Sequence, residues 1–136
     1  MAQVLRASDA QVVEANPNYF TGTVFQSILA SGRHGVQVVR VTFAPKARTA
    51  WHTHPAGQTL HMESGTCLFQ TWGEPAQSLS TGDTVAIPAG EKHWHGASPI
   101  TVTTHLAIQP LKDGSAAEWL EYVSDEQYAA AQSTGQ

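Results

Sequence analysis

The 136-residue chain is predicted to be a single all-β domain. Its length suits one compact unit with a core of its own. Short apolar segments recur at near-regular spacing, and turns rich in glycine, proline and serine separate them. No helical pattern interrupts this series until the C-terminal end. Many short strands arranged in this way favour an antiparallel barrel or sandwich.

Six apolar segments are predicted to form strands, at residues 19–28, 36–43, 58–62, 66–72, 84–87 and 100–108. They place the core barrel at about 19–110 within one domain, 1–136. Beyond them, Ser115-Ala116-Ala117-Glu118 has the form of a capping box, and apolar residues follow it at helical spacing. Ser124 resembles a second N-cap. Short C-terminal helices are therefore expected over about 115–132, packed on the outside of the barrel.

The composition excludes several classes of partner. A formal net charge of −4 and scattered basic residues give no case for nucleic acid or an anionic membrane surface. Cys67 is the one cysteine, so no internal disulfide is possible. The chain shows neither a signal-peptide pattern nor an apolar segment of membrane-spanning length. We expect a cytoplasmic protein that acts on a small molecule.

Histidines and a glutamine in two segments predict a metal site. His52 and His54 are two residues apart, so in a strand both side chains point to one face. Gln58 returns to that face if the strand resumes after the Pro55 turn, and His93 completes the set from a second strand. Neutral imidazoles and an amide oxygen suit a divalent first-row metal. These ligands are compatible with manganese, iron, nickel, cobalt and zinc.

Strand alternation also predicts which side chains face the cavity. The charged side chain of Arg40 places Val39, Val41 and Phe43 on the inner face of their strand. Alternation groups His105, Ala107 and Gln109 on the inner face of another strand. His95 shares its face with His93, whereas His61 and Glu63 should point away from the site. The predicted substrate pocket consists of Val39, Val41, Phe43, Ala107 and Gln109.

The spacing of these residues resembles that of the cupins. The first cupin motif is matched by His52, His54, Gln58 and Gly65, and the second by Gly82, Pro88, Gly90 and His93. The chain departs from the motifs at Lys46, where glycine is usual, at Gln58, where glutamate is usual, and at Ala97, where asparagine is usual. The resemblance implies a jelly-roll β-barrel with a metal in its mouth.

A narrower resemblance covers almost the whole chain. The run from Ala47 to Pro55, the run from Gly90 to Gly96 and the segment 104–109 are similar to small bacterial cupins that include manganese-dependent (R)-selective hydroxynitrile lyases. The chain departs from them at His61-Met62-Glu63. This resemblance favours manganese as the metal and implies cleavage and formation of cyanohydrins such as mandelonitrile.

The ligand set favours non-redox chemistry. Because Gln58 is neutral, the metal keeps its full positive charge, which strengthens Lewis acidity and disfavours oxidation. A histidine would carry the proton, and we expect His105 rather than His95 because its strand is central. Two alternatives stay open: an iron-dependent cupin dioxygenase that consumes oxygen, and a non-catalytic barrel that binds a small molecule. Single-domain cupins resemble one another in pairing through their sheets, so a homodimer or homotetramer is expected.

Overall fold

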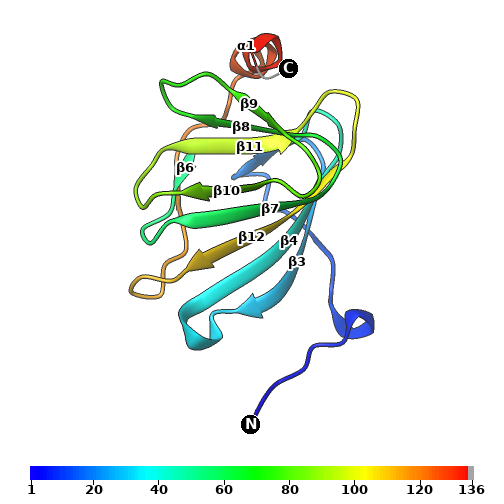
Figure 1. Ribbon diagram of the computed structural model, residues 1–136, viewed down its shortest axis with the longest axis vertical. Coiled ribbons are helices and arrows are strands. Elements are labelled where there is room, and N and C mark those ends of the chain that lie inside the picture. Colours follow the sequence, from blue (N-terminus) through cyan, green and yellow to red (C-terminus); the bar gives the residue numbers. More distant parts are fainter. Residues whose placement is uncertain (135–136) are drawn as a thin grey trace.

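The protein folds as two antiparallel β-sheets in a jelly-roll arrangement, seen here in a computed structural model that describes residues 1–134 (Figure 1). One sheet has six strands in the order β1-β3-β4-β12-β7-β10. The other has seven, with the order β13-β6-β11-β5-β2 and with β8 and β9 paired beyond β11. The strands are β1 (Val13–Glu14), β2 (Phe20–Thr21), β3 (Val24–Ser31), β4 (Val36–Phe43), β5 (Arg48–Thr49), β6 (His52–Thr53), β7 (Gln58–Ser64), β8 (Cys67–Thr71), β9 (Gln77–Leu79), β10 (Thr84–Ile87), β11 (His93–Ala97), β12 (Thr103–Pro110) and β13 (Glu118–Trp119). The helices are the 3-10 turns η1 (Ala7–Asp9) and η2 (Arg33–Gly35) and the α-helix α1 (Asp125–Thr134).

The predicted strands are confirmed, with changes at their ends. Val36–Phe43 and Thr84–Ile87 have the predicted bounds. The segment 19–28 is divided into β2 and β3 because the chain turns at Gly22, which has a φ of 82°. The short strands β1, β5, β9 and β13 were not predicted, since two or three residues carry too little pattern to be recognised.

The prediction of helix over the first part of 115–132 is wrong. Glu118–Trp119 forms a strand, β13, that pairs with β6 and sets Trp119 opposite His52. The helix α1 begins only after Ser124. The Ser124 hydroxyl accepts a hydrogen bond from the Gln127 backbone N–H at 3.1 Å, and the Gln127 side-chain oxygen accepts one from the Ser124 N–H at 2.9 Å. This capping box is the second N-cap that the sequence predicted, and α1 is the one α-helix of residues 1–134.

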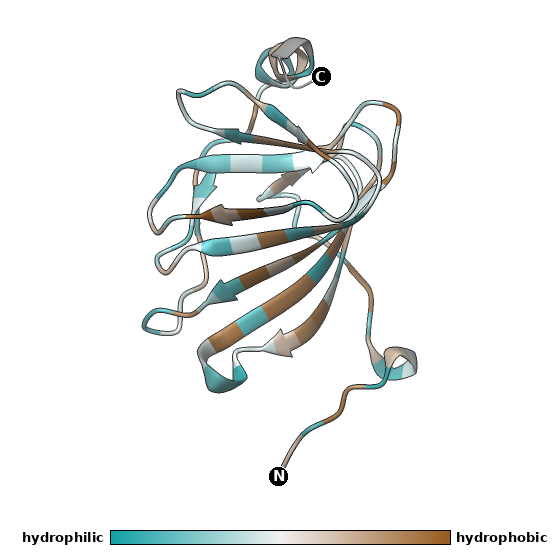
Figure 2. Ribbon diagram, in the orientation of Figure 1, coloured by the Kyte–Doolittle hydropathy of each residue, from teal (hydrophilic) through white to brown (hydrophobic). Residues whose placement is uncertain are grey.

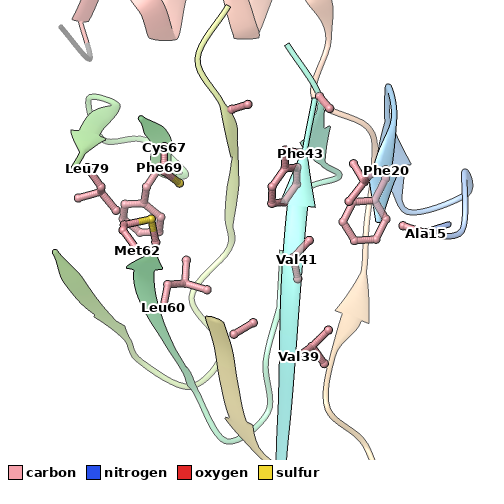
Figure 3. Packing of buried hydrophobic residues seen from close by; sticks show 14 of the residues in the cluster. Ala15, Phe20, Val39, Val41, Phe43, Leu60, Met62, Cys67, Phe69 and Leu79 are labelled. Atoms are coloured by element: carbon pink, nitrogen blue, oxygen red, sulfur yellow. The ribbon is translucent and has the colours of Figure 1, made fainter. Parts of the chain in front are cut away.

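The hydrophobic core lies between the two sheets (Figure 3). Polar residues interrupt the apolar ones along β4 (Figure 2), and Val39, Val41 and Phe43 are buried while Arg40 is exposed, as predicted. Leu60, Met62 and Phe69 fill the space on the β7 and β8 side. A second cluster covers the outer face of the other sheet beneath α1, and comprises Trp51, Leu68, Ala76, Trp94, Val123, Tyr128 and Ala131.

Two backbone positions account for parts of the predicted motif. Gly65, in the turn between β7 and β8, has a φ of 77°, and a Cβ added there would lie 2.1 Å from the Val102 carbonyl oxygen. Only glycine fits this turn. Lys46 has a φ of 72°, which explains why glycine is usual at that place in the motif.

No helix among residues 1–134 has the length and apolar character needed to cross a membrane.

Candidate metal centre

The predicted ligands come together where the two sheets meet. His52 on β6 is the register partner of His93 on β11, and their ring centroids are 4.2 Å apart. The His54 ring lies 4.9 Å from that of His52 and 5.3 Å from that of His93. Gln58 opens β7, and its Oε1 lies 3.1 Å from Nε2 of His93. All four side chains are buried.

Backbone carbonyls orient the three imidazoles. Nδ1 of His52 lies 2.8 Å from the Ala50 carbonyl oxygen, Nδ1 of His54 lies 2.6 Å from that of Ala116, and Nδ1 of His93 lies 2.8 Å from that of Glu91. A carbonyl oxygen can only accept, so each Nδ1 carries the proton and donates it. In a neutral ring Nε2 then presents a lone pair. Such outer hydrogen bonds are typical of histidines that bind metals.

Burial keeps these rings neutral. It lowers the pKa of His93 to about 4 and also lowers that of His54. The pKa of His52 falls well below its usual range because of burial and the neighbouring His93 and His54. All three rings are therefore neutral near pH 7, the state in which imidazole binds a metal.

The arrangement of acceptors fits a bound cation. Nε2 of His54 is buried without a hydrogen-bond partner. Oε1 of Gln58 faces Nε2 of His93 at 3.1 Å, although neither atom has a proton to share in this tautomer. Facing lone pairs repel, and a cation between them would turn that repulsion into coordination. The nitrogen and oxygen atoms of His52, His54, Gln58 and His93 are of the kind that divalent first-row metals bind.

A tighter group contains one residue from outside the predicted ligand set. Ring nitrogens of His52, His93 and His95 all lie within 4.8 Å of one another, so His95 stands in this group where His54 was expected. Nε2 of His95 is also buried without a partner. These three histidines could hold a metal ion.

A cavity of about 250 Å³ opens beside these residues. His52, His54, Gln58 and His95 line it on the metal side. Of the predicted pocket residues, Val39, Val41, Ala107 and Gln109 line it and Phe43 does not. The ring of Phe43 packs instead against His105 and His95, with centroids 5.3 Å and 5.9 Å apart.

The cavity wall includes residues that the sequence did not indicate. They are Phe20, Gln26, Gln37, Thr49, Ala116, Ala117 and Trp119. Gln37 has the same strand parity as Val39 and Val41, and that signal could have identified it. Trp119 carried no such signal, because its neighbours suggested a helix.

His95 and His105 form a buried pair. Nδ1 of His95 lies 3.0 Å from Nε2 of His105, and both rings are buried. His95 reaches the cavity, whereas His105 lies behind it and does not line the wall. His105 lies on the buried inner face of β12 together with Ala107 and Gln109, as predicted, but unlike them it does not reach the cavity wall. Burial lowers the pKa of His105 to about 4, and burial together with His105 lowers that of His95 well below its usual range.

Comparison with known proteins agrees with this fold. Residues 39–103 match the family model described as the cupin domain. The chain is 50% identical over 113 residues to a protein of Granulicella tundricola named (R)-mandelonitrile lyase, covering 82% of this chain and 86% of the relative. The chain belongs to the cupin family.

Solved structures support the same assignment. A cupin-like protein from Thermotoga maritima superimposes with a TM-score of 0.83 at 36% identity, over 90% of this chain and 92% of that one. A polyketide cyclase from Streptomyces resistomycificus shares the fold with a TM-score of 0.76 at 14% identity, over 100% of both chains. The latter likeness concerns the fold alone.

Proposed function

We propose that this protein is a metal-dependent hydroxynitrile lyase that cleaves and forms aromatic cyanohydrins such as mandelonitrile. The observation that carries the proposal is the combination of a cavity lined by His52, His54, Gln58 and His95 with 50% identity to a protein named (R)-mandelonitrile lyase. The metal set proposed is His52, His54, Gln58 and His93, with one divalent ion per subunit. Manganese is favoured, and iron, nickel, cobalt and zinc bind similar donors.

The bound ion would act as a Lewis acid that acidifies a hydroxyl and polarises a carbonyl. The protein supplies the proton transfer. When Nδ1 of His95 donates to Nε2 of His105, Nε2 of His95 keeps a lone pair that can receive the cyanohydrin hydroxyl proton. His105 then stabilises the protonated His95 ring by accepting a hydrogen bond from its Nδ1–H.

Proton removal is coupled to cleavage of the carbon–carbon bond. As the hydroxyl proton moves to His95, the carbon–oxygen bond becomes a carbonyl and the bond to the nitrile carbon breaks. Cyanide leaves with that electron pair and takes the proton from His95, so aldehyde and hydrogen cyanide are released and the ring is neutral again. The reverse sequence forms the cyanohydrin. The role of proton carrier, predicted for His105, is thus proposed for His95 with His105 as its positioning partner.

The cavity suits a small aromatic substrate. Its volume of about 250 Å³ lies just below the range of about 300–1,000 Å³ that is usual for ligand pockets, which restricts it to a small substrate. Val39, Val41 and Ala107 give an apolar wall, and Gln109 and Thr49 add polar groups. Such a wall holds an aryl ring while the hydroxyl and nitrile reach the polar side.

The test is release of benzaldehyde from mandelonitrile by protein that has been stripped with a chelator and then reloaded with Mn(II). We expect turnover only in the reloaded sample, at the same rate with and without oxygen. No benzaldehyde from metal-replete protein would refute the lyase. Oxygen consumption during turnover would favour the dioxygenase alternative, and saturable binding without turnover would favour a binding protein.

We also propose that the protein is a cytoplasmic homodimer or homotetramer. The edge strand β1 and the adjacent β3 expose Val13, Phe25 and Ile28, with Val12 beside them. An unpaired sheet edge with exposed apolar side chains can pair with another chain, and these residues supply such a surface. Light scattering at micromolar concentration should give a mass of two or four chains, and a monomer would contradict the proposal.

A further inference from the structure

Three glutamines lie side by side across the sheet that carries Gln58. Gln37 on β4 is the register partner of Gln109 on β12, and Gln58 on β7 lies one position beyond the pair formed by Ile108 and Thr59. Since β4, β12 and β7 are neighbours in the sheet, the three side chains occupy one row, and all of them line the cavity.

Hydrogen bonds join this row in one direction. The Gln58 amide Nε2 donates to Oε1 of Gln109 at 3.1 Å, and Nε2 of Gln109 donates to Oε1 of Gln37 at 2.6 Å. Because the Gln58 NH₂ group donates its hydrogen bond to Gln109, the Gln58 oxygen points toward the histidines. Gln58 and Gln109 are buried, so an unpaired amide there would be unfavourable.

The same three side chains could also be bonded in the opposite direction. The oxygen and the NH₂ group of a side-chain amide are similar in size and shape. Rotation of all three amide groups by 180° would therefore preserve both hydrogen bonds with donor and acceptor exchanged. The Gln58 NH₂ group would then face Nε2 of His93 and donate to its lone pair. In that arrangement Nε2 of His93 has a hydrogen-bond partner without a metal. A metal ion would then meet the Gln58 NH₂ group, which cannot coordinate it, in place of the Gln58 oxygen.

We propose that Gln37, Gln109 and Gln58 form a glutamine relay in which Gln37 and Gln109 are positioning residues that hold the Gln58 oxygen toward the metal. Gln109 acts directly on Gln58, and Gln37 acts through Gln109. The inference rests on the proposed metal centre, and it assigns a role to two residues that do not touch the ion. It also explains how a neutral amide can replace a carboxylate ligand, since a carboxylate needs no such orientation.

The experiment measures Co(II) affinity by competition with a chelator, and it follows the Co(II) d–d absorption as a signature of the ligands. Gln109→Leu removes the acceptor beside Gln58 and should weaken Co(II) binding by about 10–100-fold, as is typical of residues behind a ligand. Gln37→Leu removes one neutral hydrogen bond and should weaken binding by roughly 2- to 10-fold. Both variants should change the absorption spectrum, which a uniform loss of stability would not do.

Charged variants test the direction of the relay. Gln37→Glu can only accept, so it should hold the chain as it stands and preserve affinity. Gln37→Lys can only donate, so it should reverse the chain and turn the Gln58 NH₂ group toward the metal. Gln26 lines the same cavity from β3 and has no part in the row. Gln26→Glu and Gln26→Lys therefore provide matched controls for the effect of charge alone.

The outcomes separate the relay from the metal centre. A larger loss for Gln37→Lys than for Gln26→Lys, together with weakened binding in the leucine variants, supports the relay. Unchanged affinity and spectra in both leucine variants would overturn it and leave the metal centre intact. Equal effects of lysine at positions 37 and 26 would overturn it as well, because charge would then explain the change. Wild-type protein that binds no Co(II) would overturn both proposals.

Discussion

The indole of Trp119 lies over the imidazole of His52, with ring centroids 4.6 Å apart and planes 33° from parallel. The two residues are register partners in the short pairing of β13 with β6. Tyr19 stacks on the same indole with centroids 4.8 Å apart, and Phe20 packs against it at 5.5 Å. The C-terminal segment thereby supplies an aromatic wall to the cavity beside a proposed metal ligand.

We predict that Trp119→Ala raises KM for mandelonitrile more than for an aliphatic cyanohydrin, because the wall beside an aryl ring is lost. Aromatic pairs contribute about 0.5–1.5 kcal/mol beyond burial, so the variant should also unfold at a lower temperature. Trp119→Phe keeps an aromatic face and is the control. Equal changes in KM for both substrates would contradict a role of this wall in substrate binding.

We predict that His52→Ala abolishes stoichiometric metal binding, because it removes a central ligand from a site with few others. Elemental analysis of the purified variant and of the wild type would measure this. His61→Ala is the matched control: its ring lies on the other side of β7, where Nδ1 is 2.7 Å from the Thr84 hydroxyl. Equal metal content in His52→Ala and wild type would remove the assignment.

We predict that His95→Ala retains the metal and lowers kcat by about 10²–10⁴-fold, the usual range for loss of a general base. His105→Ala should also retain the metal and lower kcat by less, since His105 acts through His95. Steady-state kinetics with metal analysis of both variants would test this. If the larger loss falls on His105→Ala, the proton role belongs to His105, as the sequence suggested. Loss of metal from His95→Ala would make His95 a ligand instead.

We predict that the metal-free protein loses stability as the pH falls from about 6.5 to about 4. Burial lowers the pKa of His93 and His105 to about 4, below the usual unfolded value of about 6.5. The unfolded chain therefore binds more protons in this window, so acid favours unfolding, and stability is complete only above it. Thermal melts in the presence of a chelator should show a falling Tm, and a constant Tm between these pH values would contradict the prediction.

We predict that Gly65→Ala destabilises the fold by more than the roughly 1–2 kcal/mol expected for a left-handed alanine, because its Cβ would collide with the Val102 carbonyl. Gly73→Ala is the control, since Gly73 has a φ of 84° but no atom within 4 Å of an added Cβ. Urea denaturation of the two variants separates the collision from the strain. Equal losses would show that the close approach at Gly65 relaxes without cost.

The sequence by itself determined the longer strands and the grouping of the candidate ligands, because both depend on local alternation. A period of two places His52 with His54 on one face and buries Val39 and Val41 opposite the exposed Arg40. The Ser124 cap likewise depends on neighbours in sequence, and its helix was predicted. Spacing within the two motifs identified the cupin family before any contact was known.

Contacts between distant segments decided the rest. Residues 115–123 have helical spacing, yet Glu118–Trp119 pairs with β6. Next to this pairing, the Leu120 N–H donates to the Trp51 carbonyl oxygen and the Trp51 N–H donates to the Glu121 carbonyl oxygen, and these bonds keep the segment out of a helix. Tertiary pairing overrides local propensity here because it satisfies backbone hydrogen-bonding groups and also packs the partly buried Trp119 against the core. Two features depend on the register across several strands. One is the position of His105 behind His95, and the other is the alignment of three glutamines in one row, Gln37, Gln109 and Gln58. No pattern within a single strand specifies that register, so only the tertiary structure could show it.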